Sequence, residues 1–159
     1  MAATADATSI IEVVLVDTDV FSFYIKGDTR ASQYDKHTKG KKWALSFATV
    51  GELLTWSKYK GWGAAKVAEL ERRIGLTGVI PYDMALCQTY AELNAQLLKA
   101  GKPIGDNDLW IAATAIRHSI PLVSHNRKHY DEIPGLVLIS ETPKILKGQM
   151  EIKDLTGEV

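Results

Sequence analysis

The sequence predicts an α/β fold, as one domain with a short central parallel sheet flanked by helices. Short apolar runs rich in β-branched residues, such as IIEVVLV at 10–16, alternate with amphipathic stretches of ten or more residues. This alternation is typical of parallel strands joined by helical crossovers. The 159 residues suffice for one domain with a real core, and neither an internal repeat nor a linker interrupts them.

Three segments are expected along the chain. Residues 1–9 have neither the positive start nor the apolar run of a secretion signal, so they are expected to be a flexible tail. The domain is expected over 10–140, and the polar 141–159 is expected to be a C-terminal tail. No stretch has the apolar length needed to span a bilayer. The lone Cys87 excludes a disulfide framework and a cysteine-based zinc site, which favours a cytoplasmic location.

The elements are expected in alternating order after the first strand at 10–16. A helix is expected over VFSFYIK, ending at Gly27, and the polar segment 29–42 is expected to be partly helical. Further strands are expected within WALSF (43–47), TGVIPYD (77–83), IPLVSHN (120–126) and GLVLIS (135–140). The remaining helices are expected over 49–60, 63–76, 84–100 and 107–118.

Several polar residues have the spacing of helix caps. Thr49 and Glu52 fit a capping box, Asp83 is expected to cap the long helix after it, and Asp106 is expected to cap the next, with Asp108 in its first turn. Each cap would contribute about 1 kcal/mol. Capping alone is therefore an adequate explanation of each acid taken singly.

The acids taken together indicate a metal site. Sites in parallel sheets form beyond the carboxyl ends of the strands, where Asp17 and Asp19 lie, and the helices carrying Glu52 and Asp108 are expected to begin at the same edge. Converging carboxylates raise each other's pKa unless a cation lies between them. Oxygen ligands without cysteine or a convincing histidine pair favour Mg²⁺ or Mn²⁺ over zinc, and such ions serve in phosphodiester hydrolysis.

Four stretches, in this order, resemble a PIN-domain ribonuclease, and more narrowly a VapC-type toxin of a toxin–antitoxin pair: VLVDTDVFSFYIKGD, SFATVGELLTWS, GKPIGDNDLWIAATAI and PLVSHNRKHYDEIPGLVLIS. The resemblance covers roughly 13–140. It implies a PIN-like fold and metal-dependent endonucleolytic cleavage of RNA that leaves a 5′-phosphate and a 3′-hydroxyl. It also implies a small antitoxin partner, a homodimer and transfer RNA as a candidate substrate.

The resemblance assigns Asp17, Glu52 and Asp108 as catalytic residues and metal ligands; Asp108 is the acid of the pattern Asp-x-x-Ile-Ala-Ala. A fourth acidic position of the family falls on Asn126, which is expected to act through a metal-bound water. Because Asn126 is an amide, Asp106 is expected to be a reserve ligand in addition to a helix cap.

Hydroxyl and basic residues complete the expected site. Thr18 and Ser124 are expected to position water or phosphate. Since the formal net charge is zero, attraction for RNA must be local, and residues 26–60 hold eight Lys or Arg against three acids. His125 and His129 are expected at the surface or on RNA rather than on zinc. The expected RNA contacts are Lys26, Arg30, Lys39, Lys41, Lys42 and Arg127.

Three other functions compete with the nuclease. Haloacid-dehalogenase-type phosphatases have motifs like VDTDVF and IGDND, but Phe21 stands where they need Thr or Val, and no strand is expected before Asp106. A receiver domain needs an Asp at the end of its middle strand, which neither WALSF nor TGVI supplies. A catalytically silent PIN-type module that binds RNA or protein is disfavoured by the retention of all three acids.

Overall fold

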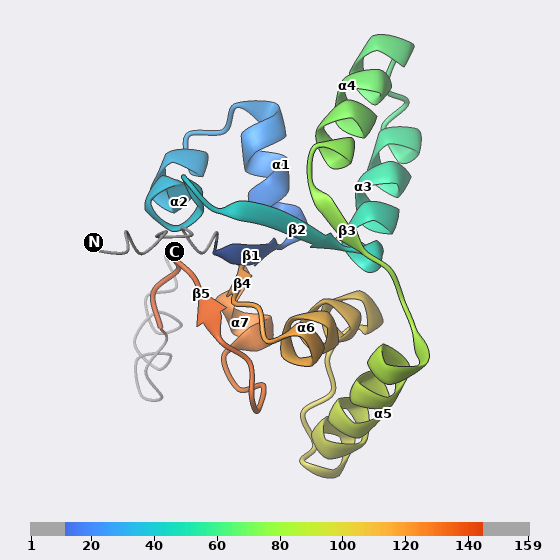
Figure 1. Cartoon of the computed structure of the whole chain (residues 1–159), viewed down its shortest axis with the longest axis vertical. Helices are drawn as coiled ribbons and strands as arrows, with labels where there is room; N and C mark the ends of the chain where they lie inside the picture. The colour runs from blue at the N-terminus through green and yellow to red at the C-terminus, as the bar shows by residue number, and fades with distance from the viewer. Residues whose placement is uncertain (1–11, 145–159) are drawn as a thin grey trace, which may run out of the picture.

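The computed structural model describes residues 12–144, which form one five-stranded sheet in the order β3-β2-β1-β4-β5 (Figure 1). Every neighbouring pair of strands is parallel. The strands are β1 (Val13–Val16), β2 (Lys42–Ser46), β3 (Gly78–Ile80), β4 (Leu122–Val123) and β5 (Leu138–Ile139). The predicted α/β class and parallel sheet are confirmed.

Helices cover both faces of this sheet: α1 to α4 lie on one side and α5 to α7 on the other (Figure 1). None of the helices within 12–144 has the length and apolar character that crossing a membrane requires. Their bounds are α1 (Thr18–Lys26), α2 (Ala31–Thr38), α3 (Phe47–Tyr59), α4 (Ala64–Gly75), α5 (Met84–Lys99), α6 (Asp106–His118) and α7 (Arg127–Tyr130).

The first strand explains why the core has two halves. Successive side chains of a strand point to opposite faces. Val14 and Val16 accordingly pack with residues of α1, α3 and α4, whereas Leu15 packs with residues of α5 and α6. All three are at most 1% exposed. The strand is apolar on both faces because both faces are covered by helices.

The sequence correctly predicted the end of α1 and the start of α5. α1 ends before Gly27, whose φ of 64° is the left-handed conformation that glycine adopts without steric cost. Asp83 caps α5, and its Oδ1 accepts a hydrogen bond of 2.7 Å from the backbone N of Leu86. Both predictions are confirmed.

Two other predicted caps were wrong. α3 begins at Phe47, directly after β2, and its cap is Ser46, whose Oγ accepts from the backbone N of Ala48 at 3.3 Å. Thr49 and Glu52 therefore lie inside the helix and form no capping box. α6 is capped by Gly105, which has the extended dihedrals of a cap residue, and no side-chain hydrogen bond caps the helix. Asp106 is already helical, so it is not the cap.

Two segment boundaries lie at the limits of the described residues. Glu141 and Thr142, expected in the C-terminal tail, contact the domain: Glu141 pairs with His37, and the hydroxyl of Thr142 donates to the carbonyl oxygen of His125. The expected tail at 1–9 and the part of the other tail beyond residue 144 lie outside the described residues.

Candidate active site

Acidic side chains from three elements line one cavity at the carboxyl edge of the sheet. Asp17 follows β1 directly and caps α1, Glu52 lies in the second turn of α3, and Asp108 lies in the first turn of α6. The cavity has a volume of about 350 Å³. Its lining includes Asp17, Asp19, Glu52, Asp108, Asn126 and Lys26. The structure therefore brings together the three acids that the sequence singled out.

Asp17 is the most deeply placed of these acids. It is 4% exposed. Its Oδ1 accepts a hydrogen bond of 2.8 Å from the backbone N of Thr18, and its Oδ2 accepts one of 2.6 Å from the hydroxyl of Ser124. Burial and, to a smaller extent, the negative charges of Asp19 and Asp108 together raise the pKa of Asp17 to about 8, against the lowering effect of those two hydrogen bonds. A cation in the cavity would favour its charged form.

Asp108 is held by two residues of α7. The hydroxyl of Tyr130 donates to Oδ1 at 3.1 Å, and Nδ1 of His129 lies 2.6 Å from Oδ2. Burial raises the pKa of Tyr130 above its ordinary value, and the nearby charges of Asp17 and Asp108 raise it further. Tyr130 therefore keeps its proton and remains a hydrogen-bond donor to Asp108.

Glu52 is oriented from two other elements. The hydroxyl of Thr18 donates to Oε2, and the side-chain amide of Asn107 donates to Oε1 at 2.9 Å. The hydroxyl of Thr18 thus points to Glu52 in this structure, and Ser124 points to Asp17. Both hydroxyls position acids, which is a role that the sequence did not suggest for them.

Asp19 is an acid of the cavity that the predicted ligand set left out. Its Oδ2 accepts a hydrogen bond of 3.1 Å from the backbone N of His125, and burial raises its pKa, with a further contribution from the charge of Asp108. The signal was present in the sequence, because Asp19 follows Asp17 by two residues beyond a buried strand. Asn107 and Tyr130 were missed as well, since only their tertiary contacts reveal their role.

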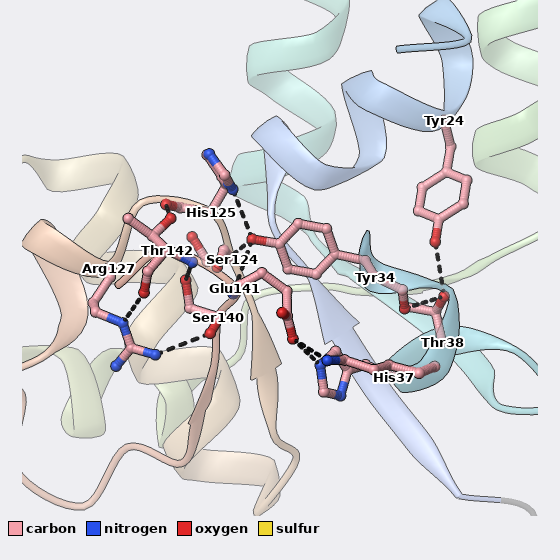
Figure 2. A network of polar contacts seen from close by, with 11 residues as sticks. Tyr24, Tyr34, His37, Thr38, Ser124, His125, Arg127, Ser140, Glu141 and Thr142 are labelled. Carbon is pink, nitrogen blue, oxygen red and sulfur yellow. Dashed lines mark hydrogen bonds and ion pairs between the residues drawn. The ribbon is translucent and has the colours of Figure 1, made fainter. Parts of the chain in front are cut away.

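The loop between β4 and α7 is held by a polar network (Figure 2). The buried Tyr34 of α2 places its hydroxyl 2.8 Å from Nδ1 of His125, and the same hydroxyl accepts from the backbone N of Glu141 at 3.3 Å. The carbonyl of His125 accepts from Thr142. These bonds hold the segment that presents Ser124 to Asp17 and the backbone of His125 to Asp19.

The basic residues of 26–60 that are expected to contact RNA lie at opposite ends of the parallel strands. Lys26 and Arg30 line the acidic cavity. Lys39, Lys41 and Lys42 precede or begin β2, so they lie at its amino end, whereas the acids lie at the carboxyl ends. Lys39, Lys41 and Lys42 are therefore separated from the acids, and their contact with RNA stays a prediction.

Arg127 has protein partners within the domain. Its Nε and Nη2 donate to the carbonyl oxygens of Thr142 and Ser140 at 2.6 and 2.9 Å, as Figure 2 shows. Its Nη1 pairs with Asp131 at 3.0 Å. These contacts tie α7 to the chain after β5.

The two secondary ligand candidates differ in position. Asn126 lines the cavity, and its side-chain amide lies 2.7 Å from Nδ1 of His129. Asp106 is exposed and outside the cavity lining, with its Oδ1 3.4 Å from the hydroxyl of Tyr90. Of the two, Asn126 is therefore closer to the role that the sequence suggested.

The donor set fits a hard divalent cation in chemistry, although it is not preassembled as a cage. Within residues 12–144, no group of three or more Asp, Glu, His or Cys side chains is close enough to hold a metal ion. Carboxylate and amide oxygens are nevertheless the ligands that Mg²⁺ and Mn²⁺ prefer. Glu52 and Asp108 now bond protein donors, so a shared ion would require those bonds to be exchanged.

Comparison with known proteins agrees with this arrangement. A family model described as PIN domain matches residues 14–136. Ribonuclease VapC1 of Haemophilus influenzae (strain R2866) is 28% identical over 131 residues, which cover 78% of this chain and 94% of that protein. The tRNA(fMet)-specific endonuclease VapC of Shigella flexneri is 24% identical over 122 residues, covering 77% of this chain and 92% of that protein.

A solved structure shares the fold. The crystal structure of VapBC2 from Rickettsia felis bound to a DNA fragment from their promoter superposes with a TM-score of 0.71 at 25% sequence identity. The match covers 80% of this chain and 98% of the matched chain. The likeness therefore extends over nearly all of the described residues.

Proposed function

Because the chain belongs to the PIN domain family, we propose that it is an endoribonuclease that acts as the toxin of a type II toxin–antitoxin system. The observation that carries the proposal is the convergence of Asp17, Glu52 and Asp108 on one cavity at the carboxyl edge of the sheet. The ribonucleases to which the chain is similar support the same activity.

Asp17, Glu52 and Asp108 are the residues that would hold Mg²⁺ or Mn²⁺, with Asn126 acting through water. When bound, such an ion lowers the pKa of a coordinated water and neutralises charge that develops on a phosphate. Asp19 also lines the cavity and adds negative charge near Asp17. The raised pKa values of Asp17 and Asp19 support a site built for a cation.

The protein's own groups orient these acids. Ser124 and the backbone N of Thr18 hold both oxygens of Asp17, Thr18 and Asn107 hold Glu52, and Tyr130 holds Asp108. These contacts orient the acids in the present structure, and Glu52 and Asp108 would exchange theirs when they bind a shared ion. Lys26 lines the same cavity and would bind the RNA backbone beside the acids, whereas Arg30, also in the lining, is paired with Asp28 at 2.7 Å.

The relatives also support proposals about partners. The solved VapBC assemblies support a small antitoxin that binds this chain. The tRNA(fMet) specificity of the Shigella flexneri enzyme supports transfer RNA as the substrate class to test first. A homodimer and a cytoplasmic location remain part of the proposal.

One experiment tests the activity. Purified protein is incubated with total RNA and Mg²⁺ or Mn²⁺, with and without a chelator, beside Asp108→Asn and Asp83→Asn. Asp83 is an exposed helix cap outside the cavity, and Asn caps equally well, so this variant is the matched control. We expect cleavage to stop with the chelator and in Asp108→Asn, and to persist in Asp83→Asn. Sequencing of the products should find 5′-phosphate ends and identify the target.

Two alternative functions make different predictions. A silent PIN-type module would bind RNA or protein without metal-dependent cleavage, and Asp108→Asn would then change no cleavage activity. The hypothesis of a haloacid-dehalogenase-type phosphatase loses its support, because Asp106 follows a loop and begins α6 and does not end a strand. Cleavage that survives both the chelator and Asp108→Asn would refute the metal-dependent nuclease.

A further inference from the structure

A second hollow adjoins the acidic cavity. It has a volume of about 280 Å³ and lies between α1, α3 and the start of α4. Ser22, Lys26 and Trp56 line both hollows, so the two surfaces are continuous. The second hollow is called the tryptophan groove below. It is defined by Ser22, Lys26, Trp56, Lys60, Trp62 and Lys66.

Trp56 lies at the junction of the groove with the acidic cavity. It follows Glu52 by four residues on α3, and residues at this spacing share one face of a helix. Half of its surface is exposed. It also lines a third hollow with Asn107 and Trp110. An exposed tryptophan beside a candidate catalytic acid offers a flat surface on which a nucleobase stacks.

The groove is strongly basic, in contrast to the cavity beside it. Its lining contains Lys26, Lys60 and Lys66 and no acid. Nζ of Lys60 lies 5.2 Å from the ring centre of Trp56, and Nζ of Lys66 lies 3.8 Å from that of Trp62. Among the described residues, none of the three lysines forms an ion pair with a carboxylate. The charge of Lys26 also lowers the pKa of Asp28 in the adjoining cavity, whereas the charges of Lys60 and Lys66 are available to an anionic ligand.

We propose that the tryptophan groove binds a single-stranded stretch of RNA next to the cleaved phosphate. A nucleobase stacks on Trp56, and backbone phosphates lie against Lys26, Lys60 and Lys66. Alternating aromatic and cationic side chains are how proteins hold single strands without reading sequence. The inference rests on the proposed function, because it assigns the groove to the substrate of the adjoining acids.

Charge explains why a chain of zero net charge would need this groove. Asp17, Asp19, Glu52 and Asp108 line the cavity, and negative carboxylates repel the phosphates that must approach them. The cations of the groove offset that repulsion within reach of the same strand. A short apolar protein segment would use the tryptophans but would leave the three ammonium groups unpaired, so the charge favours RNA.

Binding is measured separately from cleavage. Asp108→Asn protein in chelator is titrated into a fluorescein-labelled, random-sequence single-stranded RNA of about 12 nucleotides, within the span that single-strand sites cover. Trp56→Ala in this background should weaken binding roughly 5- to 150-fold, the range that stacking of one base provides. Trp56→Phe keeps an aromatic ring and should restore most of the affinity.

The lysines are tested through salt dependence. Lys60→Gln should reduce the slope of log affinity against log salt by about 0.7, the contribution of one phosphate contact on a single strand. Lys99→Gln is the matched control, because Lys99 is an exposed lysine in the last turn of α5, on the other side of the sheet (Figure 1). Its slope should equal that of the parent protein. Thermal melting of each variant verifies the fold.

The outcomes separate the groove from the nuclease. The inference is overturned if Trp56→Ala leaves the RNA affinity unchanged and Lys60→Gln leaves the salt slope unchanged. The same result is expected if the groove holds a protein segment. Cleavage by the unmodified chain would then leave the proposed function standing. Conversely, the expected binding changes without any cleavage by the unmodified chain with metal would support the groove and refute the nuclease.

Discussion

The hydroxyl of Ser124 donates a hydrogen bond of 2.6 Å to Oδ2 of Asp17, although the two residues are 107 positions apart in the sequence. Asp17 follows β1 and Ser124 follows β4, and these two strands are parallel neighbours in the sheet. The register of the sheet therefore determines the contact. The bond stabilises the charged form of Asp17, but burial outweighs it and raises the pKa of Asp17 to about 8.

This pKa makes the stability of the metal-free protein dependent on pH. The folded chain binds the proton of Asp17 more tightly than the unfolded chain does, because the pKa of this carboxyl group in the unfolded chain has its ordinary value of 3.8. The resulting stabilisation is complete below about pH 4 and is lost as the pH rises through about 8. In chelator, the melting temperature should fall by several degrees from about pH 5 to about pH 8. Asp17→Asn should flatten this fall, whereas Asp83→Asn should not.

The same carboxylates should make the protein's stability respond to divalent cations. At pH 8, Mg²⁺ that binds only the folded chain stabilises it by about 2.7 kcal/mol when its concentration is a hundred times the dissociation constant. We expect the melting temperature to rise with Mg²⁺ and to return with chelator. Asp17→Asn should abolish the rise. A rise of equal size in Asp17→Asn would mean that the ion binds elsewhere.

The parts of the fold predicted correctly depend on local chemistry. The run of apolar residues in β1, the glycine at position 27 and the cap at Asp83 each determine their structure within a few residues. The two wrong caps depend on tertiary context. β2 pairs with β3 as far as Ser46 and passes directly into α3, so the helix starts before the capping-box motif begins.

The parts of the site that were missed are non-local. Asn107 reaches Glu52 across 55 positions, and Tyr130 reaches Asp108 across 22, so no pattern in either segment reveals the contact. Lys42 could have been placed away from the acids from the sequence alone. It precedes an expected strand, and residues before a parallel strand lie at the edge opposite the site.

The two aspartates of GDND should respond differently to substitution. Asp106 is exposed, makes no cap and has one long contact with Tyr90. Asp106→Ala should retain cleavage and lose at most about 1 kcal/mol of stability, the value of an acid in a helix's first turn. Asp108→Ala should lose cleavage and keep the fold. Activity measured with matched melting curves tests this, and equal loss of cleavage in both would make Asp106 a ligand.

Arg127 should behave as a structural residue rather than an RNA contact. Its guanidinium bonds the carbonyls of Ser140 and Thr142 and pairs with Asp131. Arg127→Gln should lower the free energy of unfolding by about 1–3 kcal/mol, because it leaves half-buried acceptors without their donors. The salt dependence of RNA binding should stay unchanged at a temperature where the variant is folded. If the slope of log affinity against log salt fell by about 0.7 in Arg127→Gln, Arg127 would instead contact an RNA phosphate.

Thr49 offers a substitution that should stabilise the protein. It is fully buried in α3, and its Oγ1 is the one buried side-chain oxygen or nitrogen in residues 12–144 that lacks a hydrogen-bond partner. An unsatisfied buried hydroxyl costs roughly 1–3 kcal/mol, and valine has nearly the same shape without it. Thr49→Val should therefore raise the free energy of unfolding by about 1 kcal/mol, as measured by chemical denaturation.

A matched control lies in α6. Thr114 is equally buried, but its hydroxyl donates to the carbonyl of Trp110 at 2.7 Å and lies 3.2 Å from Oγ of Ser46. Thr114→Val removes a partner that both groups use, so it should destabilise the protein by about 1 kcal/mol or more. Replacing threonine by valine should thus change the free energy of unfolding in opposite directions at these two buried positions, because only Thr114 is hydrogen-bonded. Destabilisation of similar size by Thr49→Val would show that Thr49 has a partner after all.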